Sequence, residues 1–283
     1  MPRGRWTLDV SVLWSNSFAW TQDEAGESPK DRRFLVDGET VTLAASVRRG
    51  LGDDADVGLH VPLRHRGGGM LDGFIDAWHR LAALPDGRRP SFRRDAFRVE
   101  GRTTAGEPFS WSDRPGTGLG NMEVDLRWRA RDGGHRSASI ALVGRLSLPT
   151  ATPPFDGNGT GAAGQVLLGV PLGRHLDGYA GAGATVQGGG PVDGVEYETV
   201  RGVGFLALEW RPWTGTSLVA ETNAATRLVR NVDRYPGLHW VVNLGARIDI
   251  GSSARLDLGL TENIQHQQST TDLAFYVALG LRP

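Results

Sequence analysis

The chain contains no cysteine among its 283 residues, which excludes disulfides, thiol nucleophiles and cysteine-based metal sites. It contains no run of about 20 apolar residues, so the sequence predicts no membrane-spanning helix. The formal net charge of −1 gives no electrostatic reason to expect nucleic-acid binding. Lys30 is the only lysine, so nearly all positive charge is carried by arginine. None of these absences excludes a membrane β-barrel, whose strands need only about ten alternating residues each.

Apolar and polar side chains alternate along most of the chain. In "ARLDLGLT", Leu256, Leu258 and Leu260 share one parity, whereas Arg255 and Asp257 share the other. A period of two predicts a β-strand with one apolar and one polar face. The same alternation recurs in "TLDVSVLW", "TVTLAASVRR", "DVGLHVPLRH", "NMEVDLRWRAR", "SIALVGRLSL" and "QVLLGVPL", and again in the closing "LAFYVALGL". An all-β fold follows from this pattern.

The connections between these segments alternate between short and long. Short turns are expected at 52–55, 132–135, 173–175, 212–215 and 251–253, and longer loops at 21–32, 67–117, 149–161, 188–196 and 228–235. Brief turns at one end and long loops at the other are typical of outer-membrane barrels. We therefore predict a single domain over residues 1–283, a transmembrane up-and-down antiparallel β-barrel of about 12 strands. Its leucine-rich parity faces lipid, its long loops are extracellular, and a soluble sandwich is the alternative.

The polar parity then points into the barrel. Buried charges must be paired or hydrated, so the near balance of signs predicts a narrow, wet lumen with weak ion selectivity. The predicted lumen-lining residues are Arg127, Arg129, Arg145, Glu209, Arg211, Glu221, Arg247 and Asp257. Tryptophans near strand ends, at 14, 128, 210, 213 and 240, fit the aromatic girdles of such barrels.

One segment, "GGGMLDGFIDAWHRLAALPDGRRP", breaks the alternation. Its apolar residues recur at helical spacing, which predicts a short helix over about 70–84, ended by Pro85 and Gly87, inside the long loop 67–117. We expect this helix to form a gate at the outer mouth, and its candidate residues are Asp72, Phe74, Asp76, Trp78 and His79. An apolar slide for hydrophobic solutes and a plain packing element are the alternatives. The segment "AFRVEGRTTAGEPFSW" that follows predicts a small hairpin in the same loop.

The sequence shows no catalytic constellation. Asp72, Asp76 and His79 have a spacing that metal ligands or an acid–base group can use, but this spacing is common on solvated helices. We therefore predict no metal, no cofactor and no catalytic residue. The arginine-rich stretch "PDGRRPSFRRDAFR" could contact lipopolysaccharide phosphates or be a solvated loop.

Four stretches carry a family resemblance: "WSNSF" (Trp14–Phe18), "MLDGFIDAWHRLAALPDGRR", "GLGNMEVDLRWR" and the closing "YVALGLRP". Together they resemble an uncharacterised family of proteobacterial outer-membrane proteins, a domain of unknown function similar to barrels linked to aromatic-compound degradation. The resemblance spans nearly the whole chain and implies a Gram-negative outer-membrane barrel that passes small molecules. It would also imply a signal peptide, which "MPRGRWTLDV" does not resemble, and a terminal aromatic residue where this chain has Leu281-Arg282-Pro283.

These observations predict a narrow outer-membrane channel for small solutes, aromatic or hydrophobic ones among them, and not an enzyme. The expected partners are membrane lipid, lipopolysaccharide, the solute and the barrel assembly machinery, with no nucleic acid and an open oligomeric state. Two other classes stay open: an outer-membrane enzyme with its site at the mouth, and a closed structural or partner-binding barrel.

Overall fold

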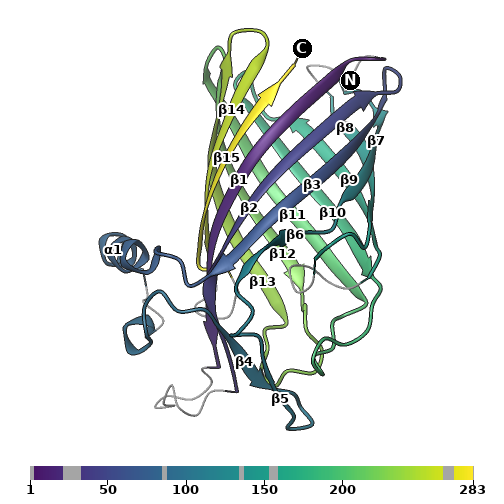
Figure 1. The fold of residues 1–283 in the computed structure, drawn as a ribbon. Helices are drawn as coiled ribbons and strands as arrows, with labels where there is room; N and C mark the ends of the chain where they lie inside the picture. Colours follow the sequence, from purple (N-terminus) through teal and green to yellow (C-terminus); the bar gives the residue numbers. More distant parts are fainter. Residues whose placement is uncertain are drawn as a thin grey trace.

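The computed structural model describes residues 3–21, 33–84, 88–133, 137–152, 159–263 and 271–282. Within these residues, 12 antiparallel strands pair in a closed ring, because β1 pairs with β15 and β2 pairs with β3 (Figure 1). The ring contains β1 (Trp6–Trp20), β2 (Phe34–Gly50), β3 (Ala55–Gly67), β7 (Glu123–Arg131), β8 (Ser139–Ser147), β9 (Gly161–Pro171), β10 (Leu176–Gln187), β11 (Val200–Trp213), β12 (Thr216–Thr226), β13 (Leu238–Ile250), β14 (Ala254–Asn263) and β15 (Leu273–Leu281). The predicted barrel of about 12 strands is confirmed.

The two ends of the barrel differ as the connections predicted. The intervals 51–54, 172–175, 214–215 and 251–253 separate consecutive strands at one end, which also holds both chain termini (Figure 1). The intervals 68–122, 148–160, 188–199 and 227–237 lie at the other end. We call these the short-turn end and the long-loop end. The helices of the described part of the chain are too short and too polar to cross a bilayer.

The outer wall is apolar because the leucine-rich parity of the strands faces outward. Large exposed side chains on this wall include Leu206, Leu244 and Val166, and leucines and valines repeat around the ring. Of the five tryptophans near strand ends, those at 128, 210, 213 and 240 are exposed on this wall, whereas Trp14 is half-buried. The leucine parity therefore faces outward, as predicted for a lipid-facing surface and opposite to a soluble sandwich.

The long interval between β3 and β7 holds the remaining elements. They are α1 (Asp72–Ala82), the 3-10 helix η1 (Arg89–Ser91), β4 (Arg98–Arg102), β5 (Pro108–Ser110) and β6 (Gly116–Leu119). Strands β4 and β5 form the predicted hairpin, and β4 pairs with the outer extension of β2. The predicted helix exists, with Ala83 in a left-handed conformation after its last turn. Pro85 and Gly87, expected to end it, lie outside the described residues.

Candidate functional site

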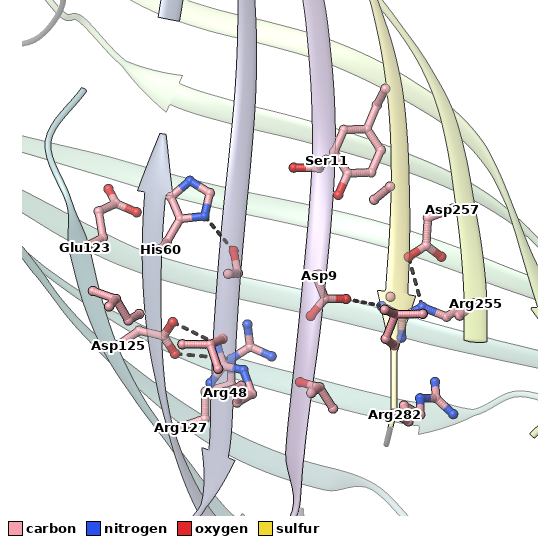
Figure 2. Close-up of a pocket in the computed structure, with 18 of the residues that line it drawn as sticks. Asp9, Ser11, Arg48, His60, Glu123, Asp125, Arg127, Arg255, Asp257 and Arg282 are labelled. Carbon is pink, nitrogen blue, oxygen red and sulfur yellow. Dashed lines mark hydrogen bonds and ion pairs between the residues drawn. The ribbon is translucent and has the colours of Figure 1, made fainter. Parts of the chain in front are cut away.

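The short-turn half of the lumen holds a charged cavity. Its volume is about 460 Å³, and its wall carries arginines and carboxylates from five strands and from Arg282, which follows β15. The charged lining residues are Asp9, Arg48, Glu123, Asp125, Arg127, Arg145, Arg255, Asp257 and Arg282, all but Arg145 labelled in Figure 2. Figure 2 shows the labelled side chains on neighbouring strands along one side of the barrel. The lining is therefore largely polar and nearly balanced in charge.

Arg48 is the centre of one ion-pair cluster. Its Nη2 lies 2.7 Å from Asp125 Oδ1, its Nη1 contacts Asp56, and Arg127 Nε lies 3.5 Å from Asp125 Oδ2. Gly58 of β3 lies between Arg48 and Asp125, and a Cβ there would be 2.6 Å from Arg48 Nη2. The glycine leaves room for a bridge that joins β2 to β7 over the strand between them.

A second cluster runs along β13, β14 and β1, on the other side of β2 from the first. Arg247 Nε lies 2.9 Å from Asp257 Oδ1, and Arg255 bridges Asp257, at 3.0 Å, to Asp9, at 3.6 Å. Farther round the ring, Glu209 Oε2 accepts a hydrogen bond from Tyr179 Oη, at 2.7 Å, and lies 3.3 Å from Arg211 Nη2. Both clusters satisfy the requirement that charges inside a barrel be paired.

The eight residues predicted to line the lumen have inward register positions. Arg127, Arg145 and Asp257 line the charged cavity itself, and Glu209, Arg211 and Arg247 belong to the second cluster. Glu221 lies deeper in the barrel and accepts a hydrogen bond from Asn243 Nδ2 at 3.0 Å. Arg129 lies at the short-turn rim, where its Nε is 3.2 Å from Asp54. Their part in solute passage stays a prediction.

The long-loop half of the barrel holds a different cavity, whose lining is mainly apolar, with Ser17, Thr40, Arg66 and Glu100 as its polar members. Its volume is about 240 Å³. The lining includes the aromatic residues Phe34, Phe97, Phe109, Trp111, Tyr197 and Tyr235 and the aliphatic residues Val36, Val99, Val195, Leu228, Val229 and Val232. Phe34 and Val36 lie on the inward parity of β2, so this cavity lies on the inner side of the barrel wall. We call it the aromatic pocket. Sequence alternation pointed to polar inward residues and did not predict it.

Loops from several strand pairs build this pocket. Phe34 of β2 packs in one cluster with Val195, Val229, Val232 and Tyr235, so segments from two long connections meet at the base of the pocket. Backbone hydrogen bonds link these segments, among them Arg230 N to Glu196 O at 2.8 Å. Trp111 is held by a hydrogen bond of 2.6 Å from its indole to Asp193 Oδ2. A run of aromatics in the β4–β5 hairpin (Phe97, Phe109 and Trp111) was the sequence signal available for it.

Helix α1 lies beside the barrel wall at the long-loop end and not across the opening (Figure 1). Its buried residues Leu71 and Ile75 pack on Leu273, with Trp14, Leu260 and Phe275 around them. The Phe74 ring lies 5.5 Å from that of Phe275, on the outward parity of β15. The expectation of a helix seated over the mouth is therefore corrected, because its apolar face packs against the apolar outer wall. A gating role for Phe74, Trp78 and their neighbours stays a prediction.

The wall beneath α1 also carries polar residues on its outward parity. Asn16, Glu39 and Glu262 each stand in register positions that leucine, valine or tryptophan occupy elsewhere. Glu39 accepts hydrogen bonds from the Trp14 indole, at 2.7 Å, and from the backbone N–H of Leu71 at the start of the helix. Three polar residues at positions where the strand pattern expects apolar ones were the sequence signal that another element covers this part of the outer wall.

The side chains of Asp72, Asp76 and His79 contact different residues. Asp72 pairs with Arg89 and accepts a hydrogen bond from Asn16 Nδ2 at 3.2 Å, and Asp76 pairs with Arg94. His79 faces Glu262 instead, with Nε2 3.6 Å from Oε1. The adjacent Glu262 carboxylate raises the pKa of His79 above its ordinary value. Among the described residues, these three side chains do not form the acid–base or metal group that their spacing would allow.

The closed ring, the apolar outer wall and the charged lumen define an outer-membrane-type β-barrel protein. The chain belongs to the family described as "Protein of unknown function (DUF3187)", which it matches over residues 5–282. No curated protein sequence matches it. The family resemblance noted in the sequence is confirmed.

Solved structures share the fold. An outer-membrane channel from Pseudomonas putida F1 superposes with a TM-score of 0.63 at 12% identity, covering 99% of this chain and 96% of that one. A mutant of the monoaromatic hydrocarbon channel TodX gives 0.51 at 11% identity, covering 100% and 91%. The KdgM porin gives 0.50 at 6% identity, covering 98% and 99%. At these identities the likeness establishes the barrel fold.

Proposed function

We propose that this protein is an outer-membrane channel that takes up small apolar solutes, monoaromatic compounds among them, at its long-loop end. The aromatic pocket is the observation that carries the proposal. Apolar cavities of about 150 Å³ hold benzene in other proteins, and this pocket has about 240 Å³. Aromatic walls with few polar groups favour such a ligand over a sugar or an ion.

Two barrels of similar fold support the same proposal, since one is a monoaromatic hydrocarbon channel and another is an outer-membrane channel. The charged cavity at the short-turn end would keep the rest of the lumen hydrated. A solute released from the aromatic pocket would then meet water and paired charges, which hold an apolar molecule weakly. Capture at one end and weak retention at the other suit a conduit better than a storage site.

Filling the aromatic pocket tests this function. Val36 points into the pocket from β2, whereas Val41 of the same strand lies on the outward parity. In cells with an intact lipopolysaccharide leaflet, we expect Val36→Trp to remove protein-dependent uptake of radiolabelled toluene and Val41→Trp to retain it. Gel mobility that changes on boiling verifies that each barrel is folded. Uptake unaffected by Val36→Trp, or no protein-dependent uptake at all, would overturn the proposal.

The predicted gate has its own test. Single-channel conductance in a planar bilayer is measured for the full chain and for a chain lacking residues 67–90. A larger conductance after deletion would support a gate. Because α1 lies beside the wall, we expect the step size to stay the same.

We infer that lipid contacts the exposed side of α1. Leu81 and Met70 are 82% and 74% exposed, and Arg80, Arg93 and Arg94 lie on or near the same segment. An apolar helix side with arginines beside it suits the boundary between acyl chains and lipopolysaccharide phosphates. An outer-membrane location also implies that the barrel assembly machinery inserts this protein into the membrane.

A further inference from the structure

The covered patch under α1 contains a convergence of three possible metal ligands. His79 comes from the helix, Glu262 from the end of β14, and Asp272 directly precedes β15. One donor atom from each residue lies within 4.8 Å of the other two. His79 Nε2 is 3.6 Å from Glu262 Oε1 and 3.9 Å from Asp272 Oδ1.

These distances do not describe hydrogen bonds. A hydrogen bond from an imidazole nitrogen to a carboxylate spans about 2.7–3.2 Å. His79 is only 6% exposed, and its Nε2 is buried without a hydrogen-bond partner among the described residues. An orphaned ring nitrogen in such a place needs a partner of another kind. His79 Nε2 faces Glu262 Oε1 and Asp272 Oδ1, so a shared partner would lie between these three atoms.

The separations are somewhat longer than those of ligands around a bound cation. Bonds of about 2.0–2.2 Å to Zn²⁺ place tetrahedral donor atoms roughly 3.4 Å apart. A cation between the three atoms therefore needs only a small inward shift of each side chain. One imidazole and two carboxylates are borderline-hard ligands of the kind that first-row divalent cations accept.

The second oxygen of each carboxylate is already held by a neighbour. The Trp78 indole donates to Glu262 Oε2 at 3.1 Å, and Arg89 Nη2 donates to Asp272 Oδ2 at 2.8 Å. Such outer contacts orient the first oxygen toward a metal and are typical of metal centres. Here they leave Oε1 of Glu262 and Oδ1 of Asp272 facing His79.

The local charge also favours a cation. The guanidinium of Arg89 contacts the carboxylates of Asp72 and Asp272, and the carboxylate of Glu262 faces His79 beside them. With His79 neutral, as a metal ligand must be, negative charge is in excess at this buried junction. A divalent ion would offset it.

We propose that His79, Glu262 and Asp272 form a site for a first-row divalent cation, for which Zn²⁺ is the probe, clamping α1 to the ends of β14 and β15. Three protein ligands leave coordination positions for water. The site lies on the outer wall, away from the aromatic pocket and the charged cavity, so it does not depend on the proposed channel function.

Isothermal titration of the folded, chelator-treated and tag-free protein in detergent with ZnCl2 tests the site. We expect one saturable site whose affinity falls at least a hundredfold in His79→Gln and about tenfold in Trp78→Phe, since Trp78 acts only through Glu262. His175→Gln, an exposed histidine in the turn between β9 and β10, is the matched control and should bind as the unchanged chain does.

A second readout separates binding from folding. Zn²⁺ should slow trypsin cleavage at the arginines of residues 88–94 at least several-fold in the unchanged chain and not in Glu262→Gln, which replaces the carboxylate with an isosteric amide. Boiling-dependent gel mobility verifies that each variant barrel is folded. Absence of saturable binding, or equal affinity in His79→Gln, would overturn the proposal and identify the cluster as a junction paired through a protonated histidine.

Discussion

Arg48 reaches over β3 to Asp125, with 2.7 Å between Nη2 and Oδ1, and it does so above a glycine, Gly58. The bridge joins two strands that do not pair with each other, β2 and β7. It shows how the lumen of this barrel is braced: inward charges are linked from strand to strand, and small residues leave room for the links.

Replacing Arg48 should destabilise the barrel. Arg48→Met leaves the carboxylates of Asp56 and Asp125 without their main cation, and both are largely buried. Removing one partner of such a charged hydrogen-bond pair costs about 2–3 kcal/mol. Urea unfolding in detergent should register this loss in the free energy of unfolding. Arg282→Met, at the exposed end of the same cavity, should cost far less; equal losses would contradict the bracing role.

The charge balance of the lumen should set its ion selectivity. The cavity carries five arginines and four carboxylates, so the unchanged pore should discriminate weakly between cations and anions. Exchanging Arg127 and Arg145 for glutamate reverses that excess. The reversal potential across a salt gradient should then shift toward cation selectivity, and the shift should shrink at high salt. A reversal potential that stays unchanged would place the ion path elsewhere.

Docking of α1 should depend on Gly69. Its φ is +70°, and a Cβ there would overlap the carboxylate of Glu39, which receives the first N–H of the helix. Gly69→Ala should therefore release the helix, which trypsin cleavage in residues 88–94 would detect as a several-fold faster rate. Gly73→Ala is the matched control, because nothing lies within 4 Å of its Cβ position. Within a helix that change should stabilise by about 0.5–1 kcal/mol.

The exposed side of α1 should contact lipid. The absence of cysteine makes a single Leu81→Cys spin label straightforward in this chain. In a reconstituted bilayer, the label at 81 should be more accessible to oxygen than to a water-soluble nickel complex. A label at Gly73, on the helix but away from Leu81, serves for comparison. The opposite order at 81 would place this side of the helix in water.

The alternation of side chains and the lengths of the connections were enough to predict the barrel. Period two in segments such as Leu256–Leu260 fixes which side chains share a face, and alternating short and long connections fix the order of strands. Because strand pairing here follows chain order, the inward positions of Arg127, Arg145 and Asp257 could be assigned without a structure.

The tertiary structure alone decided where the loops go. Helical periodicity showed that α1 has an apolar face, but the outer wall and the mouth could both bury it; Leu273 and Phe275 decided in favour of the wall. The aromatic pocket and the cluster of His79, Glu262 and Asp272 bring together residues far apart in sequence. Local sequence patterns do not predict such contacts, because the contacts depend on how separate loops pack once the ring has closed.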